Sequence, residues 1–419
     1  MLTNTKVCSI IFFVVLHKAT DFLRNTEGKM DYLGTVSRGV RAPIIRKGDD
    51  LVTIACDCVI NASKQGNFEL NDKDVLAVTE AVLGRAQGNY ATVDQIAADV
   101  AAKFGDNTVG LVFPILSRNR FSLVLKGIAK GAKKLVVQLA YPSDEVGNGL
   151  VSAEQLMDKK VNPYTDVFTA KEFYETFGNV KHRFTGVDYI DYYIKESGCE
   201  LILANNPTEI LKHTKFIINA DIHTRKRTKR ILTEAGAKKV VSLDEILVSS
   251  VNGSGYNPDY GVLGSNLATE NSVKLFPRDA QIFVDRVHDE LLKRTGKNIE
   301  VMVYGDGAFK DPVGGIWELA DPVCSPAFTD GLKGQPNEIK LKYVADNELS
   351  DLRGDEAVKK MKDLISHKQA NLVNNMLSQG TTPRQITDLL ASLSDLTSGS
   401  GDKGTPFVLI QNYFKNYSM

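Results

Sequence analysis

Short β-rich runs alternate with helical stretches along residues 116–255, and this alternation restricts the fold more than any other feature of the sequence. Strands that alternate with helices form βαβ units, so the pattern predicts a parallel sheet covered by helices. The predicted strands are KKLVVQLAY, CELILANN, KFIINAD and KKVVSL, and the helical stretches between them are NPTEILKH and HTRKRTKRILTEAG. The sequence therefore predicts an α/β fold of mixed sheets and helices.

Apolar periodicity also predicts elements outside this region. The run LVTIACDCVI (51–60) indicates a strand, and VDQIAADVAAKF (93–104) indicates a helix capped by Thr92. EIKLKYVAD is predicted to be a strand, and residues 355–396 are predicted to form two amphipathic helices, the second capped at TTPRQI. The tail PFVLIQNYFKNYSM, which follows a Ser/Gly-rich linker, is predicted to add an edge strand or to contact a partner.

The charge and cysteine content give no sign of a nucleic-acid-binding, membrane-binding, disulfide-rich or zinc-binding protein. Lys+Arg and Asp+Glu balance at 51 each, so net charge gives no indication of nucleic acid or an anionic membrane as a partner. Five cysteines are an odd number, and their spacing fits neither a disulfide framework nor a zinc site. We therefore expect a reduced, cytoplasmic protein.

The apolar run Val7–Leu16 is the one candidate targeting signal. It is shorter than the roughly 20 residues that span a bilayer, and no small-residue cleavage site follows it. A start-site artefact, with the natural beginning at Met30, is our preferred interpretation over a genuine anchor.

Carboxylates are concentrated in Val303–Asp321, VYGDGAFKDPVGGIWELAD. An apolar strand ends there at Asp306 between two glycines, which let a ligand approach the carboxylate closely. Asp311 and Asp321 follow within the same stretch, and several carboxylates on one loop suit Mg²⁺ or Mn²⁺. Lys310, in the same stretch, is the cation expected to neutralise a nucleotide phosphate. A surface turn with acidic caps is the alternative interpretation.

Two further segments contain candidate binding residues. Gly253–Asn266, GSGYNPDYGVLGSN, is rich in Gly and Ser, whose backbone N–H groups can form an anion-binding nest. Glu80–Gly88, EAVLGRAQG, carries Arg85, which can make a bidentate contact to carboxylate or phosphate. Each is a weak signal alone, because Gly-rich loops are often plain connections and lone arginines are often structural.

The order and spacing of these segments resemble the coenzyme F-420-0:L-glutamate ligase family. Gly48–Leu51 is similar to the family's GDDL-type segment, and Asp74–Gly88 to its DVLVV…SKAEGR strand and turn. Gly261–Asn266 resembles its AGIDASN loop, and Thr295–Asp306 its TGKR turn and strand ending in TD. The family adds glutamate in γ linkage to the lactyl-phosphate tail of a deazaflavin coenzyme, using GTP and a divalent metal, and its members form dimers.

The resemblance implies roles for particular residues. Asp306 falls on a metal-binding aspartate, and Arg85 on the family's lysine. The phosphate-contacting positions are Gly264, Ser265 and Asn266. The sequence departs from the family at Leu263, which stands where the family has a metal-holding aspartate, and at GAFKDP, which replaces an arginine-rich stretch.

The sequence patterns and the resemblance together divide the chain into five expected parts. Residues 116–252 are longer than the corresponding family segment, so they are expected to be an inserted or enlarged α/β lobe, or to replace part of the substrate-binding surface. The parts are a non-native or disordered extension (1–29), the N-terminal part of the ligase-like core (30–115), this lobe (116–252), the metal and nucleotide part of the core (253–350), and C-terminal helices, linker and tail (351–419).

We therefore expect a GTP- or ATP-dependent ligase that joins glutamate, or a similar amino acid, to a small-molecule acceptor. Asp306, Asp311 and Asp321 are the predicted metal ligands, with Arg85 and Lys310 as the residues that neutralise charge during catalysis. A homodimer is expected, and no nucleic-acid or membrane partner. A binding protein that has lost turnover is the alternative, supported by Leu263. A nucleotide-binding oxidoreductase lobe is disfavoured, because the glycine fingerprint is missing.

Overall fold

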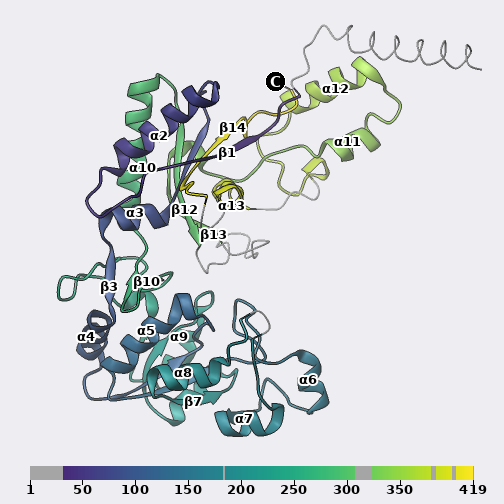
Figure 1. The fold of residues 1–419 in the computed structure, drawn as a ribbon. Helices are drawn as coiled ribbons and strands as arrows, with labels where there is room; N and C mark the ends of the chain where they lie inside the picture. Colours follow the sequence, from purple (N-terminus) through teal and green to yellow (C-terminus); the bar gives the residue numbers. More distant parts are fainter. Residues whose placement is uncertain (1–31, 183–184, 307–322, 379–383, 399–402, 419) are drawn as a thin grey trace, which may run out of the picture.

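The computed structural model describes residues 32–182, 185–306, 323–378, 384–398 and 403–418 (Figure 1). These residues form two main bodies joined by a small sheet, with a pair of helices projecting from one side. Within the described residues, no helix has both the length and the apolar character needed to cross a membrane.

The first body is built on a five-stranded sheet in the order β1-β14-β2-β12-β13. Only the β2–β12 pair is parallel, and the other neighbours are antiparallel. The strands are β1 (Val36–Val40), β14 (Phe407–Gln411), β2 (Val75–Thr79), β12 (Glu300–Asp306) and β13 (Val323–Phe328). We call this part the five-stranded body.

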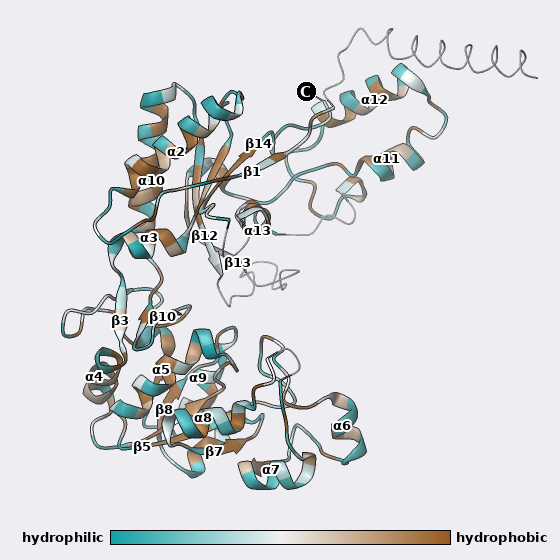
Figure 2. Cartoon of the chain, viewed as in Figure 1, coloured by the Kyte–Doolittle hydropathy of each residue, from teal (hydrophilic) through white to brown (hydrophobic). Residues whose placement is uncertain are grey.

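Alternate residues of these strands face two different cores. Leu76, Val301 and Leu409 pack with α2 (Leu51–Gly66) and α10 (Ala280–Thr295) on one side. Ala77 and Met302 pack with α13 (Ile386–Ser398) on the other. Successive side chains of a strand point to opposite faces, so a sheet covered on both faces needs continuous apolar strands. Figure 2 shows the inner strands of this sheet as mainly hydrophobic between the helices.

The second body is an α/β lobe with a six-stranded sheet in the order β6-β7-β5-β4-β8-β9. All pairs are parallel except β6–β7. The strands are β4 (Thr108–Val112), β5 (Lys134–Leu139), β6 (Phe168–Thr169), β7 (Glu200–Leu203), β8 (Phe216–Asn219) and β9 (Lys239–Ser242). From β4 the chain proceeds to β5 and β7 on one side, and then to β8 and β9 on the other, which is doubly wound topology.

Helices cover both faces of this sheet. On one face lie α4 (Val93–Phe104), α5 (Arg118–Gly131) and α8 (Tyr189–Ser197). On the other lie the 3-10 helix η1 (Pro207–Lys212) and α9 (Arg225–Glu234). Helix α7 (Ala170–Phe177) contacts β6, and α6 (Ala153–Asp158) precedes β6 in the chain. The α/β class and the parallel strands predicted from residues 116–255 are confirmed.

A three-stranded sheet in the order β10-β11-β3 lies between the two bodies (Figure 1). Its strands are β3 (Tyr90–Thr92), β10 (Asn266–Thr269) and β11 (Ser272–Lys274). The chain leaves the five-stranded body after α3 (Glu80–Gln87), builds the lobe, and returns through β11 to α10.

Beyond β13 come η3 (Asp330–Leu332), α11 (Leu341–Asn347), α12 (Gly354–Ser366) and η4 (Met376–Ser378). The remaining 3-10 helix is η2 (Leu243–Glu245), which follows β9.

The lobe begins earlier than the sequence suggested. We placed its first residue at 116, but β4 is an inner strand of its sheet, and Ile96 and Val100 of α4 belong to its core. The boundary at 115/116 therefore falls inside the lobe. The helix predicted over 93–104 is confirmed, with Thr92 in a capping box with Gln95.

Three predicted elements differ from the structure. Residues 51–60 form the first part of helix α2, because Asp50 caps its N-terminus and the buried Leu51, Ala55 and Val59 recur every four residues. EIKLKYVAD contains helix α11 in place of a strand. The C-terminal strand β14 lies inside its sheet, between β1 and β2, and is not an edge strand.

Candidate active site

The carboxyl ends of β2 and β12 meet at one edge of the five-stranded body. The two strands run parallel, and Thr79 lies opposite Tyr304 in their register. Glu80, which follows β2, and Gly305–Asp306, which end β12, are therefore brought to the same edge. A Cβ at Gly305 would collide with Cγ of Glu80, so the glycine is needed for this close approach.

Glu80 at this edge forms a buried ion pair with Lys274. Nζ of Lys274 lies 3.0 Å from Oε1 of Glu80, and the two side chains are 13% and 5% exposed. Glu80 begins helix α3, where the helix dipole favours a negative charge, and Lys274 ends β11. Two charges withdrawn from water in this way are held by their mutual attraction. Neither residue was singled out from the sequence, since 194 positions separate them.

The residues predicted to contact phosphate, Gly264, Ser265 and Asn266, lie in two different environments. Asn266 lies directly opposite Lys274 in the β10–β11 register, so it is next to the Glu80–Lys274 pair. Gly264 has a φ of +72° and packs against the ring of Phe276. Ser265 is 2% exposed and faces the lobe, where it lines a cavity of about 20 Å³, room for a single water molecule. Only Asn266 of the three is thus placed beside the buried pair.

The backbone of this loop is already engaged with the protein. The N–H groups of Gly261, Val262, Leu263 and Ser265 donate to the carbonyls of Asn257, Leu243, Tyr260 and Val262. An anion nest needs N–H groups that point at the ligand, so these four donors do not supply one.

Leu263, which stands at the family aspartate position, is part of the lobe core. It is 2% exposed and lines the same small cavity as Phe121 and Ile222. Its side chain therefore serves packing, and it supplies no oxygen to a metal.

A network at the start of the lobe connects this edge to the rest of the molecule. Nδ2 of the buried Asn89 donates to the carbonyl of Phe276 at 2.6 Å, and its Oδ1 accepts from Nη1 of Arg278 at 2.7 Å. The Arg278 guanidinium lies 4.8 Å from the ring centroid of Tyr256. Gln87 accepts a hydrogen bond from the backbone N–H of Arg278 at 3.1 Å. The network fixes α3 relative to β11, and hence Glu80 relative to Lys274.

The remaining predicted site residues have mixed outcomes. Arg85 lies on α3 with an exposed side chain, on the same short helix as Glu80. Asp306 is the last residue of β12 and pairs in register with Val323 of β13. Lys310, Asp311 and Asp321 lie outside the described residues. The described residues contain no group of three or more His, Cys, Asp or Glu side chains that could hold a metal.

The charged residues near this edge are suited to binding a charged ligand. The carboxylate of Glu80, neutralised by the ammonium of Lys274, lies where the two parallel strands end. Asp306 is the last residue of β12 at this edge, and Arg85 is exposed in the last turn of the helix that Glu80 begins. In open, mostly parallel sheets ligands bind outside the carboxyl ends of the strands, and the β2–β12 pair is the parallel pair of this sheet.

Comparison with known families identifies one family that the chain matches. The family model described as F420-0:Gamma-glutamyl ligase matches residues 39–412, from within β1 to just after β14, so the match includes the α/β lobe. No curated protein matches the chain. Because the family match extends over most of the sequence, the chain belongs to the F420-0:gamma-glutamyl ligase family.

Proposed function

We propose that the protein is a nucleotide- and divalent-metal-dependent ligase that joins an amino acid such as glutamate to a carboxylate-bearing acceptor through an amide bond. The single observation that supports this most is the edge at the ends of β2 and β12, where Gly305, the residue before Asp306, lies against Glu80 of the buried Glu80–Lys274 pair. Family membership supplies the γ-glutamyl type of bond, which forms when the activated carboxylate is the γ-carboxylate of a glutamyl group on the acceptor.

The reaction has to overcome the low reactivity of a carboxylate anion. In the proposed sequence, a carboxylate oxygen of the acceptor attacks the γ-phosphorus of GTP or ATP, the bond from the γ-phosphorus to the bridging oxygen breaks, and an acyl phosphate forms. The amine nitrogen of glutamate then attacks the acyl carbon, forms the C–N bond and releases phosphate, while the amine loses its proton to solvent. The protein contributes by positioning the reactants and neutralising charge.

Residues of the edge have distinct proposed roles. Arg85 is exposed and available to an anionic substrate or a nucleotide phosphate. Lys274 is held by Glu80, so we assign it a positioning role. Asn266, opposite Lys274, contacts phosphate through its side-chain amide.

Mg²⁺ or Mn²⁺ would be held by Asp306, with Asp311 and Asp321 as further ligands in this proposal. Carboxylate oxygens are the ligands that these ions prefer. When bound, such an ion offsets the negative charge of the nucleotide phosphates. Since Leu263 is buried in apolar surroundings, no oxygen comes from that position.

A phosphate-release assay tests the proposed activity. We expect Mn²⁺- or Mg²⁺-dependent hydrolysis of GTP or ATP that rises when glutamate and acceptor are added together. Asp306→Asn removes a metal ligand and should lower the turnover by roughly a hundredfold, the size of a typical lost transition-state contact. Asp351→Asn, the same change at an exposed position, serves as the matched control. Undiminished turnover in Asp306→Asn would remove Asp306 from the mechanism.

A binding protein without turnover is the second candidate, and the packing of Leu263 in the lobe core favours it. In that case calorimetry would detect nucleotide binding, while no phosphate would be released with any combination of metal, glutamate and acceptor.

A further inference from the structure

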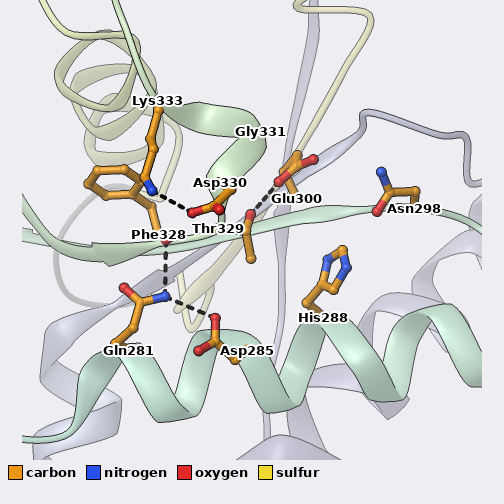
Figure 3. Close-up of a pocket in the computed structure, with 10 residues that line it drawn as sticks. All are labelled: Gln281, Asp285, His288, Asn298, Glu300, Phe328, Thr329, Asp330, Gly331 and Lys333. Atoms are coloured by element: carbon orange, nitrogen blue, oxygen red, sulfur yellow. Dashed lines mark hydrogen bonds and ion pairs between the residues drawn. The ribbon is translucent and has the colours of Figure 1, made fainter.

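A cavity of about 750 Å³ lies between helix α10 and the end of β13 (Figure 3). This volume falls within the roughly 300–1,000 Å³ of small-molecule sites. Its lining residues come from α10, the start of β12, and the segment from Phe328 through η3: they are Gln281, Asp285, His288, Asn298, Glu300, Phe328, Thr329, Asp330, Gly331 and Lys333.

Glu300 is the buried charge of this cavity. It is 7% exposed, and its Oε2 accepts a hydrogen bond from the hydroxyl of Thr329. Its Oε1 lies against the Cα of Gly331, where a Cβ would collide with it, and has no hydrogen-bond partner among the described residues. No lysine, arginine or histidine of the described chain forms an ion pair with Glu300. A buried carboxylate without a cation is costly, so the site is suited to a ligand that supplies one.

The other polar groups of the cavity are mainly acceptors. Asp285 is exposed and accepts from Nε2 of Gln281 at 2.9 Å through one oxygen, which leaves the second oxygen available. Nδ1 of His288 lies 2.9 Å from the carbonyl of Ile299. A carbonyl only accepts, so Nδ1 carries a proton, and Nε2 is a further acceptor whenever it carries none.

The lysine in the lining, Lys333, does not neutralise the charge of these acceptors. Lys333 is held by Asp330, with Nζ 2.7 Å from Oδ1, as the dashed line in Figure 3 shows. Asp285 and Glu300 are thus the carboxylates of the lining that have no cationic partner among the described residues. The described residues contain no group of three or more His, Cys, Asp or Glu side chains that could hold a metal ion. The lining therefore favours an organic cation over a metal ion.

The cavity is remote from the candidate active site. Glu300 begins β12 and Asp306 ends it. At about 3.3 Å per residue the two positions are roughly 20 Å apart. A ligand in the cavity therefore does not contact the edge at which ligation is proposed, and this inference does not depend on the proposed function.

We propose that this cavity binds an aliphatic amine that carries primary ammonium groups, with Glu300 and Asp285 as its anionic partners and Nε2 of His288 as a neutral acceptor. An ammonium group has three donors and no acceptor, so it matches a lining of this kind.

Isothermal titration calorimetry of the full chain with 1,4-diaminobutane at low ionic strength tests the proposal. The uncharged butane-1,4-diol is the control ligand, because it has a similar length and no ammonium. Asp285→Asn changes an exposed residue and should weaken binding about tenfold, the value of one charge-assisted hydrogen bond. Glu300→Gln should weaken it at least as much. Glu290→Gln is the matched control variant, since Glu290 lies on α10 outside the lining.

The outcomes separate the proposal from its alternatives. Diamine binding that Asp285→Asn weakens and Glu290→Gln leaves unchanged supports it. Equal binding of the diol, the absence of diamine binding, or an unchanged affinity in Asp285→Asn would overturn it. Binding of MnCl₂ alone that Asp285→Asn abolishes would also overturn it, by assigning the cavity to a metal. If circular dichroism shows that Glu300→Gln is unfolded, Asp285→Asn decides.

Discussion

At the scale of single residues, the candidate site depends on a charge pair that the protein has removed from water. Glu80 and Lys274 are mostly buried, so the loss of one partner leaves the other charge without compensation. The sequence predicts Asp306, because an apolar strand ends at it between glycines. It does not predict Glu80 or Lys274, because a pair that forms through tertiary contact leaves no local pattern.

Lys274→Met should destabilise the fold by about 3 kcal/mol or more, because the buried Glu80 carboxylate loses its cation. Urea denaturation measures the free energy of unfolding. Lys130→Met is the matched control: Lys130 and Asp94 form an ion pair of 2.6 Å with side chains 61% and 75% exposed, and such surface pairs contribute less than about 1 kcal/mol. The double variant Glu80→Gln with Lys274→Met should regain part of the loss. Equal effects of Lys274→Met and Lys130→Met would refute the importance of the buried pair.

Burial controls the chemistry of Cys56 on helix α2. Burial raises the pKa of this thiol from 9.0 to about 11. At pH 8 the reactive thiolate is therefore scarce, and the fully buried sulfur is also shielded. We expect iodoacetamide to modify Cys56 only after unfolding, and the half-buried Cys58 to react first. Peptide mapping by mass spectrometry measures both, and equal rates in the folded protein would contradict the expectation.

The same shift predicts a pH dependence of stability. The folded state disfavours the Cys56 thiolate, so the contribution of this thiol is fully present below pH 9 and is lost as the pH rises toward about 11. Cys56→Ala should reduce the fall in unfolding free energy between these pH values, measured by urea denaturation at each pH. A fall of the same size in this variant would assign the alkaline loss to other groups.

At the scale of elements, strand β14 shows where sequence interpretation succeeded and where it failed. The run PFVLIQ predicts a strand, and the structure contains one. Its place at the end of the chain favoured an edge position, but all five of its residues are buried. A continuous apolar run is typical of a strand covered on both faces, and β14 lies between β1 and β2. Its inner position thus follows from apolar continuity, which outweighs its location in the sequence.

Leu409→Ala tests how much β14 contributes to the five-stranded body. The side chain is fully buried and packs in the core shared with α2 and α10. Its truncation should lower the free energy of unfolding by about 2–5 kcal/mol, from the lost burial and the cavity left behind. Leu396→Ala, on α13 with a residue exposure of 71%, should change it by less than about 0.5 kcal/mol. A similar small effect at both positions would mean that β14 is dispensable.

Helix α2 is an element whose type the sequence interpretation predicted wrongly. The sequence predicts a strand for LVTIACDCVI, because it is a short apolar run. The buried positions Leu51, Ala55 and Val59 follow helical spacing, and the Asp50 cap is a helix signal. Short apolar runs satisfy both periods, and here packing against α10 decided between them.

At the scale of the whole molecule, the fold is two bodies connected through a small sheet and the hydrogen bonds of Asn89. The sequence predicted the α/β lobe, because the strand and helix signals of residues 116–255 are local. It did not predict that the chain returns through β11 to place Lys274 beside Glu80, since that return is a long-range contact. The family match over residues 39–412 extends through both bodies.

The central claim is that this chain forms γ-glutamyl amide bonds at the edge where β2 and β12 end. Mass spectrometry of a carboxylate-bearing acceptor, with the deazaflavin acceptor of the resembled family as the first one tried, after incubation with the full chain, glutamate, GTP and Mn²⁺ tests it most directly. The account predicts an acceptor heavier by one glutamyl residue, a product that requires all four components and is lost in Asp306→Asn but not in Asp351→Asn. A folded protein that yields no glutamylated acceptor with GTP or ATP, or an Asp306→Asn variant that yields as much product as the natural chain, would contradict it.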